Sequence, residues 1–199
     1  VSAHSFAGGV VAVNYHKMLG LYNGGMVRAN EEVGAITSLN ESEVEVVRCF
    51  YISGTATNGL DVGTPQTADQ AYNGTTAYSL NDFGYDKRWA QDGNHPSVAL
   101  PDGSDAVVHT VTFYGFDSAY YYLAATKHGG TAVTPPAPVV EGYNFLYWNV
   151  PYDNVTENIS TTAVFDRDNL ITFTPTATVE YFSSEYINVF CGFDPEAGV

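Results

Sequence analysis

Residues 107–114 read Val-Val-His-Thr-Val-Thr-Phe-Tyr, and apolar side chains recur there at alternate positions. This period of two places every second side chain on one face, which predicts a half-buried β-strand. Residues 120–123 (Tyr-Tyr-Tyr-Leu), 142–148 (Gly-Tyr-Asn-Phe-Leu-Tyr-Trp) and 161–165 (Thr-Thr-Ala-Val-Phe) predict further strands. The prolines of residues 135–138 exclude a central strand between them, because proline has no amide donor.

The aromatic residues of 142–148 cannot all be buried if this segment is a regular strand. In a regular strand, Tyr143, Phe145 and Tyr147 share one face, whereas Trp148 begins the other. A small module needs large apolar anchors, so we expect Tyr143, Phe145 and Trp148 to be in the core. Burying all of them requires a bend or bulge near residues 146–147.

The three consecutive tyrosines of residues 120–122 cannot all be buried. Successive strand residues point to opposite faces, so at least one of these rings must be exposed. An exposed tyrosine can stack on a sugar ring or contact a protein partner. These residues therefore give a weak indication of a binding surface.

Residues 108–166 resemble the Listeria–Bacteroides repeat, also called the internalin B-repeat. The matching residues, in chain order, are Val111-Thr112-Phe113, Gly130-Thr131-Ala132-Val133, Pro135, Pro138, residues 142–148 and residues 161–165. Tyr147 stands where the family usually has glycine. The resemblance implies a small β-grasp-like module that occurs in tandem on bacterial surfaces, as a spacer or a partner-contact surface.

The first part of the chain contains an internal repeat. Residues 7–14 (Ala-Gly-Gly-Val-Val-Ala-Val-Asn) align with residues 33–40 (Val-Gly-Ala-Ile-Thr-Ser-Leu-Asn) at an offset of 26. A second β-like run follows each copy, residues 26–29 in the first and 44–51 in the second, and we expect these runs to correspond. Stacked copies would bury a continuous core, with Gly and Asn at the corners. The alternative is an ordinary hairpin sheet whose similarity is accidental.

Residues 7–52 resemble the GLUG repeat of bacterial surface proteins. The matches are Gly8 to Asn14, Val33 to Ile36, and Val47 to Tyr51. Ala12 and Ser38 stand where the family prefers glycine, and Arg48 where it prefers asparagine. The resemblance implies a β-solenoid of outer-surface repeats that has no catalytic residues of its own.

The chain is therefore expected to be mainly β and to consist of four segments. Residues 1–65 form a short β-solenoid-like repeat region, and residues 66–106 form a connector. Residues 107–167 form the β-grasp-like module, and residues 168–199 form C-terminal strands of unknown affiliation.

One short helix is expected in the connector. Thr67 is a candidate N-cap, and Gln70 stands at the capping-box position. The helix would end near Asn81. Its apolar side would consist of Ala71, Ala77, Tyr78 and Leu80.

Composition excludes some classes of function. The 199 residues contain 7 Lys and Arg against 22 Asp and Glu, which gives a net charge of −15. We expect no nucleic-acid partner, because a chain this acidic repels phosphate. No apolar run approaches the ~18 residues of a membrane span, so this segment is not expected to span a membrane. The chain opens on Val1 without a charged leader, so we expect a piece of a longer protein.

Cys49 and Cys191 are the only cysteines, and both stand in apolar runs. Each is expected to be a small buried hydrophobic residue. Two cysteines alone do not decide whether they pair. No CxxC motif is present and no histidine stands near either cysteine, so a zinc site has no support.

The sequence contains none of the common catalytic motifs. The sequence has no Gly-x-Ser-x-Gly, P-loop, Rossmann or HExxH motif. Residues 166–169 space carboxylates loosely as in a calcium loop but lack its glycine and final glutamate, which predicts a solvated turn. Acidic pairs for glycoside hydrolysis meet in space, so the sequence leaves that chemistry open. We therefore assign no catalytic, cofactor or metal residues, and the ligand-binding residues stay unknown.

These observations predict a non-catalytic segment of a secreted or cell-surface bacterial protein. It would be extracellular and would act in adhesion or as a modular spacer. Its partner would be a protein or a glycan at the cell surface or at a host interface, and no cofactor is expected. The alternative function is a carbohydrate-binding module that uses exposed tyrosines.

Overall fold

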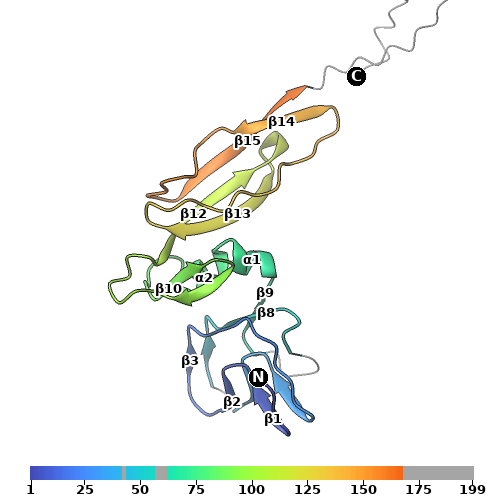
Figure 1. Ribbon diagram of the computed structural model, residues 1–199, viewed down its shortest axis with the longest axis vertical. Helices are drawn as coiled ribbons and strands as arrows, with labels where there is room; N and C mark the ends of the chain where they lie inside the picture. The colour runs from blue at the N-terminus through green and yellow to red at the C-terminus, as the bar shows by residue number, and fades with distance from the viewer. Residues whose placement is uncertain (42–43, 57–61, 168–199) are drawn as a thin grey trace, which may run out of the picture.

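The computed structural model describes residues 1–41, 44–56 and 62–167. These residues are mainly β, with several small sheets and two short α-helices. Figure 1 shows three units along the long axis: short strands at the N-terminal end, a helical unit with a hairpin, and a four-stranded sheet. Within the described ranges, no helix has both the length and the apolar character needed to cross a membrane.

The first unit is built from short strands in parallel pairs. The pairs are β1 (Phe6–Gly8) with β5 (Glu32–Gly34), β2 (Val11–Asn14) with β6 (Thr37–Asn40), β3 (Met18–Leu19) with β7 (Val46–Val47), and β4 (Tyr22–Asn23) with β8 (Phe50–Ile52). Gly8 lies beside Gly34 and Asn14 beside Asn40. The predicted alignment of residues 7–14 with 33–40 is therefore confirmed as the register of these strands.

Glycine and asparagine occupy the corners of this unit, as predicted. A Cβ atom on Gly8 would lie 1.8 Å from the carbonyl oxygen of Val11, and one on Gly34 would lie 1.7 Å from that of Thr37. Only glycine allows the backbone to approach itself this closely. At the other end of the paired strands, the Asn14 amide donates to Asn40 Oδ1 at 2.7 Å.

The predicted correspondence of the second runs is wrong. Residues 46–51 pair with residues 18–23 and not with 26–29, where Val27 instead forms a bridge with Ala56. Residues 18–23 take this place because the apolar side chain of Met18 is buried in the core, in one cluster with Ile36 and Cys49.

Cys49 is a buried hydrophobic residue, as predicted. Its side chain is 1% exposed and belongs to the core of the first unit. Burial raises the pKa of its thiol, which keeps the sulfur protonated at neutral pH. Cys191 and the predicted C-terminal strands lie outside the described residues.

The connector contains two short helices where one was predicted. Strand β9 (Thr64–Gln66) pairs with β8 and leads into α1 (Ala68–Tyr72), which α2 (Thr75–Leu80) follows. Gly74 lies between the helices at φ +84, and a Cβ atom there would lie 2.2 Å from the carbonyl oxygen of Ala125. The close approach of the neighbouring sheet therefore breaks the helix. The predicted capping box of Thr67 and Gln70 is confirmed.

The connector is completed by an antiparallel hairpin of β10 (Trp89–Asp92) and β11 (His95–Val98). Ala106 forms a bridge with Ala90 of this hairpin. The Ala125 amide donates to the carbonyl oxygen of Asn73. Packing and hydrogen bonds therefore join the connector to the following sheet across the predicted boundary near residue 106.

The last described unit is a four-stranded mixed sheet in the order β13-β12-β15-β14. Its strands are β12 (Val107–Tyr114), β13 (Tyr120–Lys127), β14 (Tyr143–Trp148) and β15 (Ile159–Arg167), and a 3₁₀ turn (Phe116–Ser118) joins the first two. The central strands β12 and β15 are parallel, and each outer strand is antiparallel to its neighbour. The strands predicted at 107–114, 120–123, 142–148 and 161–165 are present.

The bulge predicted near residues 146–147 is present, because the ladder between β14 and β15 shifts register between Phe145 and Tyr147. The shift brings Phe145 and Trp148 to one face, where their rings lie 5.3 Å apart. Trp148 also packs edge-on against the fully buried Phe113, with 4.9 Å between ring centroids. Phe145 and Trp148 are half-buried.

The prediction that Tyr143 belongs to the core is wrong. Its side chain is 37% exposed. Tyr143 pairs with Arg167 at the end of the ladder, where fewer residues surround its side chain than at the middle of the sheet. Its ring instead packs against Phe116 of the 3₁₀ turn, at 4.7 Å.

Candidate functional site

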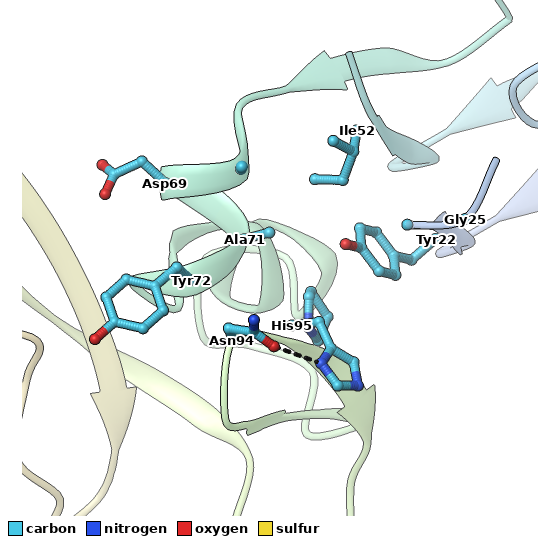
Figure 2. A pocket seen from close by; sticks show the side chains of 11 residues that line it. Tyr22, Gly25, Ile52, Asp69, Ala71, Tyr72, Asn94 and His95 are labelled. Carbon is cyan, nitrogen blue, oxygen red and sulfur yellow. Dashed lines mark hydrogen bonds between the residues drawn. The ribbon is translucent and has the colours of Figure 1, made fainter. Parts of the chain in front are cut away.

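An open groove of about 930 Å³ lies between the first unit and the connector. It is formed by β4 and β8 on one side and by α1 and the tip of the β10–β11 hairpin on the other. Figure 2 shows Tyr22 and Ile52 at one end of the groove and Tyr72 at the other. The residues that give it chemical character are Tyr22, Ile52, Ala71, Tyr72, Asn94 and His95.

Tyr22 is held in place by its neighbours on both sides. Its ring packs edge-on against Trp89 of the hairpin, with 6.4 Å between centroids. The Asn23 side chain donates to the carbonyl oxygens of Gly25 and Ala35 and accepts from the Gly25 amide, which fixes the turn after β4. Partial burial raises the pKa of the Tyr22 phenol, so its hydroxyl can donate as well as accept hydrogen bonds at neutral pH.

Tyr72 combines a fixed backbone with an exposed ring. The Gln91 amide donates to the carbonyl oxygens of Ala71 at 2.7 Å and of Tyr72 at 3.2 Å, which satisfies the end of α1. The Tyr72 side chain is nevertheless 47% exposed. A tyrosine side chain has only two χ angles, so it loses little conformational entropy when a ligand packs on its ring.

Asn94 and His95 supply polar groups at the hairpin tip. Asn94 Oδ1 and His95 Nδ1 lie 3.2 Å apart, and both residues are exposed. Figure 2 shows this pair below α1, between Tyr72 and Tyr22 in the view. The amide and the imidazole together offer both donors and acceptors to the groove.

Asp69 stands on the far side of α1, and in Figure 2 its carboxylate points away from Tyr22. It accepts hydrogen bonds from the Tyr122 hydroxyl at 2.9 Å and from the Asn73 amide at 3.3 Å. Burial, aided by this carboxylate, raises the pKa of Tyr122 to about 12, so the hydroxyl keeps its proton at neutral pH. Asp69 is therefore already engaged between α1 and β13.

A smaller hollow of about 230 Å³ lies on that side of α1, where the predicted tyrosines of residues 120–122 are found. Tyr120 is 66% exposed and Tyr121 is 36% exposed, so the prediction that at least one ring is exposed is confirmed. The Tyr121 hydroxyl donates to the carbonyl oxygen of Pro136, which ties its ring to the surface of the sheet.

The residues of the larger groove were not predicted as a site. No sequence pattern marked Tyr22, Asn94 or His95 as site residues. Tyr72 carried a usable signal, since it lies outside the predicted apolar side of the helix and so had to be exposed. Their grouping depends on three segments that meet only in the folded chain.

In the described ranges, no group of three or more His, Cys, Asp and Glu side chains is arranged to hold a metal ion. The turn predicted at 166–169 is wrong for its first two residues, because Asp166 and Arg167 pair with Asn144 and Tyr143 as the end of β15. Both are exposed, as predicted, and residues 168–169 lie outside the described residues. The comparisons with known proteins found no matching family model, no matching curated protein and no matching solved structure.

Proposed function

We propose that the chain is a non-catalytic segment of a secreted or cell-surface bacterial protein, acting in adhesion or as a modular spacer. The observation that carries this proposal is the register of the first unit, in which one copy of the sequence repeat lies directly on the next. Repeats that stack in this way build extended structures one copy at a time. An extended structure suits a segment that projects other domains from a surface.

The finer architecture belongs to the same proposal. The parallel pairs of the first unit support a β-solenoid with two turns, as in GLUG repeats. The sheet order β13-β12-β15-β14, with parallel central strands, supports a β-grasp-like module, as in the Listeria–Bacteroides repeat. Both resemblances point to surface proteins of bacteria.

Contacts between consecutive units support a semi-rigid spacer. Tyr22 of the first unit packs against Trp89 of the connector. Arg48 forms ion pairs with Asp82 and Asp86, at 3.0 and 3.2 Å. Such contacts restrict bending between units, which a projecting segment requires.

Surface exposure of the native protein tests this proposal. An antibody raised against the chain should label intact cells of the organism that makes it, and protease treatment of those cells should remove the epitope. A cytoplasmic protein of the same cells serves as the control and should survive the protease. Detection of the chain only after lysis would contradict the proposal.

A second candidate function is carbohydrate binding, which the exposed rings of Tyr72, Tyr120 and Tyr121 favour. Exposed aromatic rings offer a flat apolar surface on which sugar rings can stack. The test is a glycan array probed with the labelled full chain. Binding to a defined group of glycans supports this function, and background signal on every glycan contradicts it.

A further inference from the structure

We propose that the groove between the first unit and the connector binds a neutral oligosaccharide. The proposal rests on the second candidate function and assigns it to Tyr72, Asn94 and the surrounding groove. The first argument is size. A volume of about 930 Å³ lies within the ~300–1,000 Å³ that is usual for small-ligand sites.

The chemistry of the lining matches that of a sugar. Sugar rings present apolar C–H faces together with hydroxyl groups that both donate and accept hydrogen bonds. The groove presents the half-buried side chain of Ile52 and the exposed ring of Tyr72 as apolar surface. The amide of Asn94 and the ring nitrogens of His95 supply the matching donors and acceptors.

Charge excludes acidic glycans. No lysine or arginine lines the groove in the described part of the chain, and Asp69 lies at its edge. The whole chain carries a net charge of −15. A uronic or sialic acid would therefore meet repulsion without a compensating cation, whereas a neutral sugar would not.

The groove is a better site than the tyrosines of the sheet. Tyr120 and Tyr121 border the smaller hollow of about 230 Å³, which falls below the ~300–1,000 Å³ that is usual for small-ligand sites. Tyr147 is 57% exposed but stands alone on the outer face of the bulge, opposite Phe145 and Trp148. The ring of Tyr72 instead borders a hollow with polar groups that can orient a ligand. Affinity and orientation both require that combination of apolar surface and placed polar groups.

The experiment is a titration of the ¹⁵N-labelled full chain, followed by NMR. The probes are the tetrasaccharides of glucose, xylose, mannose and N-acetylglucosamine, with tetragalacturonic acid as the acidic probe. We expect saturable shifts of the Tyr72, Asn94 and His95 amide signals with at least one neutral probe, and none with the acidic probe.

Variants then assign the binding to the groove. Tyr72→Ala should weaken it about tenfold or more, Tyr72→Phe should retain most of it, and Asn94→Ala should weaken it several-fold. Tyr147→Ala is the matched control, because it removes a tyrosine outside the groove that is 57% exposed, against 47% for Tyr72, and it should leave affinity unchanged. The thermal unfolding of each variant is compared with that of the parent chain to show that it is folded.

The outcomes separate this inference from the functions on which it builds. If a neutral sugar binds but Tyr72→Ala and Asn94→Ala leave its affinity unchanged, carbohydrate binding stands and the groove assignment is overturned. If no probe binds at about 10 mM, both carbohydrate binding and the groove assignment are overturned, and the spacer proposal is unaffected. Tighter binding of the acidic probe would overturn the charge argument and with it the choice of ligand.

Discussion

At the scale of single residues, Asn81 joins the connector to the sheet. Its side chain is fully buried at the end of α2. The amide donates to the carbonyl oxygens of Trp89 at 2.6 Å and Val107 at 2.9 Å. Its Oδ1 accepts from the backbone amides of Arg88 at 3.0 Å and Trp89 at 2.8 Å. One side chain thereby satisfies two carbonyls and two amides around the start of β12.

Asn81→Ala should lower the free energy of unfolding by about 3 kcal/mol, because it leaves several buried backbone groups without a partner. Denaturant unfolding of the full chain measures the change. Asn30→Ala is the control, since the Asn30 amide makes one exposed contact, with His4, and its removal should cost less than about 0.5 kcal/mol. Equal losses in the two variants would contradict the role assigned to Asn81.

At the scale of elements, the tight corners of the first unit depend on glycine. A Cβ atom at Gly34 would meet the backbone of Thr37, which cannot move without breaking the strand pairs. The constraint is local, so the sequence shows it as a glycine at the same position of each copy. The repeat could be predicted for that reason, because each copy must place glycine before the same corner.

Gly34→Ala should therefore destabilise the chain by about 3 kcal/mol, the upper part of the range for overpacking. Gly25→Ala is the matched control in the same unit. A Cβ atom there would lie 3.6 Å from the nearest atom, an ordinary contact, so the substitution should cost little. Thermal or denaturant unfolding of both variants measures the difference, and a Gly34→Ala variant as stable as Gly25→Ala would contradict the close approach.

The strands and the bulge could be predicted because they depend on the local sequence pattern. The pairing of residues 46–51 could not, because it depends on contacts between distant parts of the chain. The alternation in residues 107–114 and the bulge before Trp148 follow from the period of a strand. The partner of residues 46–51 depends on which apolar side chain, Met18 or Val27, reaches the core beside Cys49. No local pattern contains that information. The break at Gly74 has the same origin, since it follows from the approach of a strand far along the chain.

At the scale of the whole molecule, the candidate groove was beyond sequence reasoning because its walls come from separate units. Tyr22 lies in the first unit, whereas Tyr72 and Asn94 lie in the connector. Composition could predict exposed tyrosines but not which of them border a hollow. The relative placement of the two units therefore determines the groove, and the contacts between the units determine that placement.

Arg48 makes the most strongly charged of these contacts. Its backbone has a φ of +51, a left-handed conformation that asparagine adopts more readily than arginine. The arginine places its guanidinium between Asp82 and Asp86 of the connector, and its side chain is only 19% exposed. We infer that the ion pairs of Arg48 with the connector offset the conformational strain of its left-handed backbone.

A double-mutant cycle of Arg48→Ala and Asp86→Asn measures that contact, because the cycle cancels the backbone term common to both arginine variants. We expect a coupling free energy of about 1 kcal/mol, since both partners are partly buried. The control cycle is Lys17→Ala with Glu45→Gln, an exposed ion pair within the first unit whose coupling should stay below about 0.5 kcal/mol. A coupling no larger than that of the control would mean that Arg48 does not hold the units together, and the placement of the groove would then rest on Tyr22 and Trp89.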